Sequence, residues 1–339
     1  MSNEQREPRV VVLGLGGTIA STDDGTLGDG VAPRLSAQDL IDAVPQLHGV
    51  ARIEASAFRQ VPSGDLTLAD MLQLAVEIDA QFASGVDGVV VTQGTDTLEE
   101  TSFALDLLVT SARPVVVTGA MRNPTQAGPD GPANLMAAVQ VAASPLAGGL
   151  GTLVVMNGEI HAARFVRKTH ATSPASFQSP TTGPLGWVIE DRVRVVTRVG
   201  EIADVGPRAV RSIAPVALVT CALGDDGRIL DELVALNYQG AVIQGFGAGH
   251  VPAVMVPRIE ALARQIPVVL ATRTGSGEIL TKTYGFAGSE TDVAARGAQN
   301  SGPLDGLKAR VLLSLALTLS SDASEALGLV ARVMASLTA

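Results

Sequence analysis

Short runs of valine, leucine and isoleucine alternate with longer segments of helical periodicity along most of the chain. This alternation is typical of βα units and predicts a mainly parallel sheet flanked by helices. The runs are almost entirely apolar, as expected for strands that are covered on both faces. The expected strands are Val10–Leu13, Val89–Thr92, Val115–Thr118, Leu153–Met156, Val216–Thr220, Ala241–Ile243 and Pro267–Leu270.

Five segments carry the helical pattern, and two of them begin with a capping signal. Thr67 precedes Asp70 by three residues and Thr97 precedes Glu100 by three, which predicts a helix N-cap at each threonine. Gly94–Asp96 therefore lies between a strand end and a helix start, where ligands bind in open α/β sheets. The expected helices are Leu66–Ala83, Leu98–Leu108, Asn134–Ala143, Asp305–Leu319 and one near Ser324–Leu337.

The length of 339 residues is sufficient for two domains. Glu201–Arg211 combines charged residues, glycine and proline without either periodicity, which is typical of a linker. We expect a larger N-terminal α/β domain over residues 8–200, a linker over 201–211 and a smaller C-terminal α/β domain over 212–339.

Composition excludes several classes of partner and cofactor. A net charge of −10 is unfavourable for binding nucleic acid, which needs clustered lysine and arginine. The single cysteine, Cys221, cannot form an internal disulfide, the first residues are polar, and no apolar run is long enough to cross a bilayer. The four histidines lack metal-ligand spacing. We expect a cytoplasmic protein, bound neither to membranes nor to nucleic acid, with no metal and no organic cofactor.

The first chemical candidate is the segment after the first expected strand, where Gly14, Gly16 and Gly17 precede Thr18. Glycines allow a ligand to approach the backbone and leave N–H groups free to hold an oxyanion. An ordinary βα turn is the commoner meaning of this pattern. A dinucleotide fingerprint would need a small residue where Ile19 stands, which counts against a nucleotide-binding oxidoreductase.

Two other segments could carry chemistry. In Thr92–Thr97, helix capping accounts for Thr97, and the helix dipole could account for Asp96, but neither explains Thr95 beside its glycine. The basic segment Arg164–His170 has the composition of a solvated loop. Its Lys168 can act as a base only if its neighbours lower its pKa.

Taken in order and spacing, these segments resemble the bacterial L-asparaginase family. Gly16–Ala20 and Gly94–Glu100 look like its two signature motifs, and Pro114–Arg122 resembles the segment that follows them. The similarity extends from about Arg9 to the Lys308–Leu319 helix. Further positions match at Asp130–Leu135, Lys168-Thr169 and Tyr284-Gly285-Phe286.

The resemblance implies a two-domain, cofactor-free amidohydrolase that converts L-asparagine to L-aspartate and ammonia. It implies that Thr18 is the nucleophile and that a second threonine, Thr95, works with Asp96 and Lys168. This is chemically reasonable, because a threonine hydroxyl is a weak nucleophile that needs a base within hydrogen-bond reach.

The resemblance also implies how a small amino-acid amide is bound. Ser63, followed by Gly64, would receive the substrate α-carboxylate, and the carbonyl of Ala120 would accept the side-chain amide. Asp96 and Glu278 would receive the α-ammonium. In this family the glutamate comes from a neighbouring subunit, which implies a homodimer or homotetramer with shared active sites.

Three departures from the family pattern concern the substrate site. In the family, the lid segment carries a tyrosine that helps to activate the first threonine. The corresponding segment here, Thr22–Pro33, has no tyrosine, and the only tyrosines of the chain, Tyr238 and Tyr284, lie far downstream. Gly64 stands where relatives often have glutamine, and Ala248 where many have asparagine. The missing lid tyrosine leaves the activation of Thr18 open.

Three alternatives remain beside L-asparaginase. The chain could be a glutaminase-asparaginase of broader specificity, or a catalytically impaired, asparaginase-like amino-acid-binding protein. The amidase subunit of a tRNA-dependent amidotransferase is also similar, but it carries an extra N-terminal domain, and only 15 residues precede Gly16 here.

Overall fold

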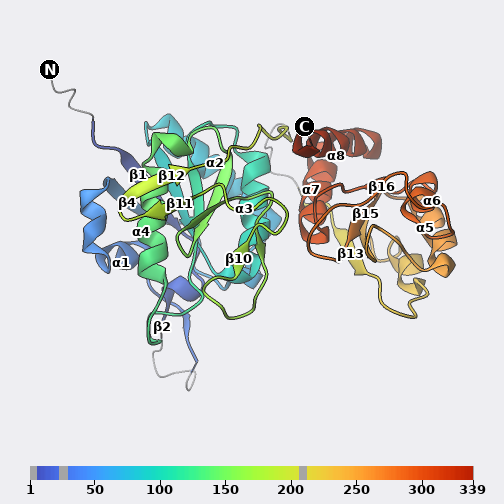
Figure 1. Cartoon of the computed structure of the whole chain (residues 1–339), viewed down its shortest axis with the longest axis horizontal. Coiled ribbons are helices and arrows are strands. Elements are labelled where there is room, and N and C mark those ends of the chain that lie inside the picture. Colours follow the sequence, from blue (N-terminus) through green and yellow to red (C-terminus); the bar gives the residue numbers. More distant parts are fainter. Residues whose placement is uncertain (1–5, 23–29, 206–211, 339) are drawn as a thin grey trace. The chain divides into compact units, whose positions relative to one another are not determined.

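The computed structural model describes residues 6–22, 30–205 and 212–338. The chain divides into two compact units, Met1–Glu201 and Ile202–Ala339, which Figure 1 colours from blue to yellow-green and from yellow to red. Residues 206–211 of the expected linker and residues 23–29 of the lid segment lie outside the described part.

The first unit contains an eight-stranded, mainly parallel sheet in the order β12-β11-β8-β7-β6-β5-β1-β4. Strands β7, β6, β5, β1 and β4 run parallel, and β8, β11 and β12 extend one edge in antiparallel fashion. The four strands expected in this unit are therefore confirmed. The strands are β1 (Arg9–Gly14), β4 (Arg52–Ala57), β5 (Gly88–Thr92), β6 (Val115–Thr118), β7 (Thr152–Met156), β8 (Glu159–Ala162), β11 (Gly186–Ile189) and β12 (Arg192–Val195).

Helices cover both faces of this sheet because successive strand residues point to opposite sides. On one face, Val10 and Val90 share a buried cluster with Leu40 of α1 and Leu135 of α4. Helices α2 and α3 pack against each other and against β5, β6 and β7 (Figure 1). The helices are α1 (Ala37–Asp42), α2 (Leu68–Ala83), α3 (Leu98–Leu108) and α4 (Gly131–Ala142).

The N-terminus of α2 carries the predicted cap. The Thr67 hydroxyl accepts from the Asp70 N–H at 3.2 Å, and the Asp70 carboxylate accepts from the Thr67 N–H at 2.9 Å. This reciprocal capping box satisfies two backbone donors that a helix start otherwise leaves unpaired.

The second unit is a smaller α/β layer structure. Its four-stranded parallel sheet has the order β13-β14-β15-β16. Buried side chains of β14 and β15 pack with those of α5, while α7 contacts β13, β14 and β15. The expected strands and helices of this half are confirmed. Its elements are β13 (Val216–Thr220), β14 (Gly240–Gly245), β15 (Val268–Thr272), β16 (Gln299–Asn300), α5 (Val256–Ala263), α6 (Glu290–Ala295), α7 (Gly306–Leu319) and α8 (Ala323–Thr338).

None of the helices in the described ranges combines the length and apolarity needed to cross a membrane.

A buried ion pair connects two segments of the first unit. The Arg164 guanidinium donates to both carboxylate oxygens of Asp106 at 2.9 and 3.2 Å and to the Gly200 carbonyl at 2.8 Å. The Thr152 N–H also donates to Asp106, at 2.8 Å. Burial raises the pKa of Asp106, and Arg164 opposes that rise. Arg164 is thus buried, although the composition of its segment predicts a solvated loop.

We expect Arg164→Met to destabilise the fold by about 3–5 kcal/mol, because it leaves the buried Asp106 without its counter-ion. Urea unfolding would measure this as a lower midpoint. Arg192→Met is the matched control, since the Arg192–Glu190 pair is exposed and its atoms are 4.0 Å apart; no measurable shift is expected there. An equal midpoint for Arg164→Met and the unmodified protein would contradict this account of the ion pair.

Candidate active site

Four parallel strands end side by side at one edge of the large sheet. Gly14 at the end of β1 lies opposite Ala57 of β4 on one side and Thr92 of β5 on the other, and Thr92 lies opposite Thr118 of β6. The chain adds β4 on one side of β1 and β5 on the other, so the strand order reverses at β1, which is where ligands bind in such sheets. The segments that follow these strands carry six of the eight predicted site residues: Thr18, Ser63, Gly64, Thr95, Asp96 and Ala120.

The segments after β1 and β5 are in direct backbone contact through two glycines. A Cβ atom on Gly17 would lie 1.9 Å from the Gly94 nitrogen, and Gly17 has a φ of 83°, so only glycine fits there. A Cβ on Gly94 would in turn lie 2.8 Å from the Ser63 Oγ. Thr18 and Thr95 each follow this contact by one residue. The glycines therefore bring the two threonine-bearing segments together.

Thr18 begins a short 3₁₀ turn, η1 (Thr18–Ala20), and is half-buried. The turn is held by bonds to the Gly17 carbonyl from the Ala20 N–H at 3.0 Å and from the Ser21 hydroxyl at 2.9 Å. Within the described part of the chain, the Thr18 hydroxyl makes no hydrogen bond.

Lys168 joins two of the predicted catalytic residues. Its Nζ donates to the Thr95 Oγ1 at 2.9 Å and to the Asp96 Oδ1 at 2.6 Å. Thr95 is 5% exposed, whereas the Asp96 side chain is 80% exposed and reaches solvent. The structure thus places a buried hydroxyl, an amine and an accessible carboxylate in one hydrogen-bonded group.

A residue outside the predicted site holds Lys168 in place. Lys168 lies on β9 (Arg167–Lys168), which pairs antiparallel with β10 (Phe177–Gln178), and its N–H donates to the Glu99 Oε2 at 3.3 Å. Glu99 is buried on α3, within the signature segment Gly94–Glu100. Nothing in the local sequence indicated that Glu99 would hold Lys168, since an acidic residue is common in the first turn of a helix.

Thr97 is the N-cap residue of α3, as predicted, but its side chain does not cap the helix. Thr97 has a φ of −118° and a ψ of 15°, outside the extended conformation that a capping side chain needs, and it makes no cap hydrogen bond. The short 3₁₀ turn η4 (Thr95–Thr97) leads directly into α3 at this residue. The Thr97 hydroxyl donates to the Ser63 carbonyl at 2.9 Å, so it fixes the Ser63 turn against the β5 segment.

Ser63 and Gly64 differ in exposure. Ser63 is buried at the start of the 3₁₀ turn η3 (Ser63–Asp65), beside Gly94. Gly64 is exposed, and a Cβ added there would meet no atom within 4 Å. The missing side chain at this position therefore leaves open space rather than a filled contact.

Ala120 is buried two residues beyond the end of β6. The adjacent Gly119 lies against the β5 segment, since a Cβ there would be 2.6 Å from the Gln93 carbonyl oxygen and 3.4 Å from the Thr95 Cγ2. The Ala120 segment is therefore packed beside Thr95.

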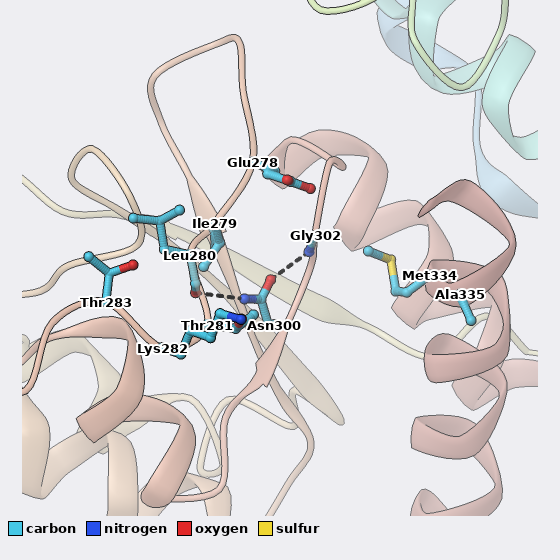
Figure 2. A pocket seen from close by; sticks show the side chains of 10 residues that line it. All are labelled: Glu278, Ile279, Leu280, Thr281, Lys282, Thr283, Asn300, Gly302, Met334 and Ala335. Carbon is cyan, nitrogen blue, oxygen red and sulfur yellow. Dashed lines mark hydrogen bonds between the residues drawn. The ribbon is translucent and has the colours of Figure 1, made fainter. Parts of the chain in front are cut away.

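Glu278 belongs to the second unit and is exposed in the loop after β15. It follows Gly277, whose φ is 82°. It lines an open concavity of about 400 Å³. Figure 2 shows its side chain above that of Asn300, with Met334 of α8 to one side.

The histidines of the described residues are not arranged as metal ligands, and no group of three or more His, Cys, Asp and Glu side chains in that part could hold a metal ion. His161 is buried with its Nδ1 3.0 Å from the Ser179 hydroxyl. Burial lowers the pKa of His161, and the nearby Glu159 opposes this. His161 is therefore a buried core residue.

Comparison with protein families agrees with this architecture. The model described as "Asparaginase, N-terminal" matches residues 9–200, and the "Glutaminase/Asparaginase C-terminal domain" matches residues 215–327. The chain belongs to the asparaginase family. The large sheet with its threonine-bearing edge is thus the N-terminal asparaginase domain, and the four-stranded sheet is the C-terminal one.

Individual relatives of this asparaginase-family chain match nearly its whole length. The L-asparaginase of Bacillus licheniformis is 38% identical over 91% of this chain and 95% of its own. The probable periplasmic L-asparaginase of Haemophilus influenzae is 36% identical over 95% of this chain and 92% of its own. The crystal structure of a probable cytoplasmic L-asparaginase from Campylobacter jejuni superposes with a TM-score of 0.86 at 33% identity, covering 96% of this chain and all of that one.

Proposed function

We propose that this protein is an L-asparaginase that hydrolyses L-asparagine to L-aspartate and ammonia through an acyl-enzyme on Thr18. The observation that carries the proposal is the hydrogen-bonded group of Lys168, Thr95 and Asp96, set beside the Gly17–Gly94 contact. Family membership supports the same reaction.

In the first step, the Thr18 hydroxyl attacks the side-chain amide carbon of the substrate. The hydroxyl proton passes to the leaving nitrogen through Thr95, whose hydroxyl is held by the Lys168 Nζ. The C–N bond breaks, ammonia leaves, and the aspartyl group remains on Thr18 as an ester. In the second step, water attacks this ester, and its proton returns to the Thr18 oxygen as aspartate is released. Splitting the reaction in this way replaces one difficult step with two easier ones.

Binding of the α-amino acid moiety uses the residues around this group. Ser63 and the open space at Gly64 take the α-carboxylate, and the accessible Asp96 takes the α-ammonium. Glu278 of a neighbouring subunit completes the ammonium site, so the working form is a homodimer or homotetramer. The Ala120 carbonyl accepts the substrate amide. The proposed location is cytoplasmic, because a chain whose only cysteine is free needs no oxidising compartment to fold.

We expect glutamine to be a weak substrate. It is one methylene longer than asparagine, and a pocket shaped for the shorter side chain discriminates by about 1–3 kcal/mol. The expected kcat/KM for glutamine is therefore about 10- to 200-fold below that for asparagine. Steady-state ammonia release from the two amides measures this ratio, and equal values would favour a glutaminase-asparaginase of broad specificity.

The activity itself is tested by ammonia release from L-asparagine, L-glutamine and their D-forms, measured side by side at saturating concentrations. Release from L-asparagine, lost in Lys168→Met, supports the proposal. If L-asparagine binds but no ammonia appears, the protein is an asparaginase-like amino-acid-binding protein and the proposed reaction is excluded.

A further inference from the structure

We propose that Asn134 and Asp130 are positioning residues that aim the Ala120 carbonyl at the substrate amide. This inference rests on the proposed function, because it concerns the acceptor for the amide nitrogen of that reaction. Its basis is a hydrogen-bond network around the turn Gly119–Arg122, which we call the β6 turn.

The Asp130 carboxylate holds two backbone donors of the β6 turn. Its Oδ1 accepts from the Met121 N–H at 3.1 Å and from the Arg122 N–H at 2.8 Å, and its Oδ2 also lies 3.1 Å from the Met121 nitrogen. Asp130 stands at the N-cap position of α4 but makes no cap hydrogen bond to that helix. The carboxylate therefore holds the backbone of the turn and does not cap the backbone N–H groups of its own helix.

Asn134 holds the other side of the β6 turn and is only 2% exposed. Its Nδ2 donates to the Gly119 carbonyl at 3.0 Å and to the Asp130 Oδ2 at 3.1 Å. Its Oδ1 accepts from the N–H of Asn157, at the turn between β7 and β8, at 2.9 Å. One buried amide thus ties together the ends of β6 and β7 and the first turn of α4.

These bonds fix the direction of the Ala120 carbonyl. The peptide bond is planar and trans, so the C=O of Ala120 points opposite to the N–H of Met121, which Asp130 holds. Asn134 fixes the preceding peptide through the Gly119 carbonyl. The peptide planes on both sides of the Ala120 Cα are therefore held. The Ala120 carbonyl points away from Asp130, and its direction is fixed before substrate binds.

The direction of the Ala120 carbonyl affects the rate of hydrolysis only when the leaving group carries an N–H that this carbonyl can accept from. Asn134→Asp keeps the size of the side chain but removes both donors, and it sets a carboxylate against the Gly119 carbonyl and the Asp130 carboxylate. We expect kcat for L-asparagine to fall about tenfold to a hundredfold, as for loss of an ordinary to a preorganised hydrogen bond. Hydrolysis of the β-methyl ester of L-aspartate, whose leaving group has no N–H, should stay within about threefold.

The experiment therefore measures the amide-to-ester ratio of kcat in the full-length protein. Asp130→Asn is the second variant and should lower the same ratio. Asn123→Asp is the matched control, because it makes the same change in the neighbouring loop and keeps the Oδ1 that accepts from Thr125; its ratio should equal that of the unmodified protein. Equal losses of amide and ester hydrolysis in both variants would overturn the positioning role and leave only a structural one. If the unmodified protein hydrolyses neither substrate, the proposed function fails, and the positioning role fails with it.

Discussion

Thr95→Val is expected to lower kcat for L-asparagine by at least about 10³-fold while the protein stays folded. The substitution keeps the shape of the side chain but removes the hydroxyl that accepts from the Lys168 Nζ at 2.9 Å. Thr18→Val should have an effect of similar size, because it removes the proposed nucleophile. Steady-state ammonia release, with far-UV circular dichroism to verify the fold, measures both.

Thr92→Val provides the matched control for these variants. Thr92 lies at the end of β5, three residues before Thr95, and its buried hydroxyl has no hydrogen-bond partner among the described residues. The same chemical change therefore removes no interaction, and turnover should stay near that of the unmodified protein. Near-normal activity of Thr95→Val would contradict the two-threonine mechanism.

Mixing two inactive variants should restore activity if the site is shared between subunits. Thr95→Val damages the first unit and Glu278→Ala the second, so a hybrid dimer has one site with both lesions and one with neither. After dissociation and reassociation at equal concentrations, about one quarter of the activity should return, since half of the random dimers are hybrids with one intact site of two. Glu278 is exposed after a glycine, as a residue that reaches another chain must be.

A second mixture tests whether the recovered activity comes from active sites shared between subunits or from reassociation itself. Thr95→Val and Lys168→Met both affect the same hydrogen-bonded group, so each site of their hybrid carries one lesion and should stay inactive. If the Thr95→Val and Glu278→Ala mixture also stays inactive although subunit exchange is verified, the ammonium site lies within one chain and the proposed role of Glu278 is wrong.

Seven of the parallel strands could be predicted because both of their faces are mostly buried, which produces continuous apolar runs such as Val115–Thr118. Strands with an exposed face were missed by that criterion. Residues of β4 and β12 alternate between exposed and partly buried positions, as in Arg192–Val195, and only a period of two would have indicated them. Short helices such as α1 were also missed, although Ser36 and Asp39 form a capping box there.

The candidate site shows a different limit. Lys168 contacts Thr95 across 73 residues of sequence, and no local pattern predicts such a contact; it was expected only from the family resemblance. Glu99 contacts Lys168 and Thr97 contacts Ser63, and both contacts join segments that are distant in sequence. The sequence of one segment therefore does not predict them. The glycines were easier to interpret, because two backbone segments can touch only where a residue has no side chain, as at Gly17 and Gly94.

The central claim is that an aspartyl ester forms on Thr18. It is tested most directly by quenching the protein with acid during turnover of L-asparagine and mapping the added aspartyl group by peptide mass spectrometry. The account predicts this group on the peptide that contains Thr18, and its absence from the Thr18→Val variant. An aspartyl group on the peptide that contains Thr95 instead, or one that persists in Thr18→Val, would contradict the account.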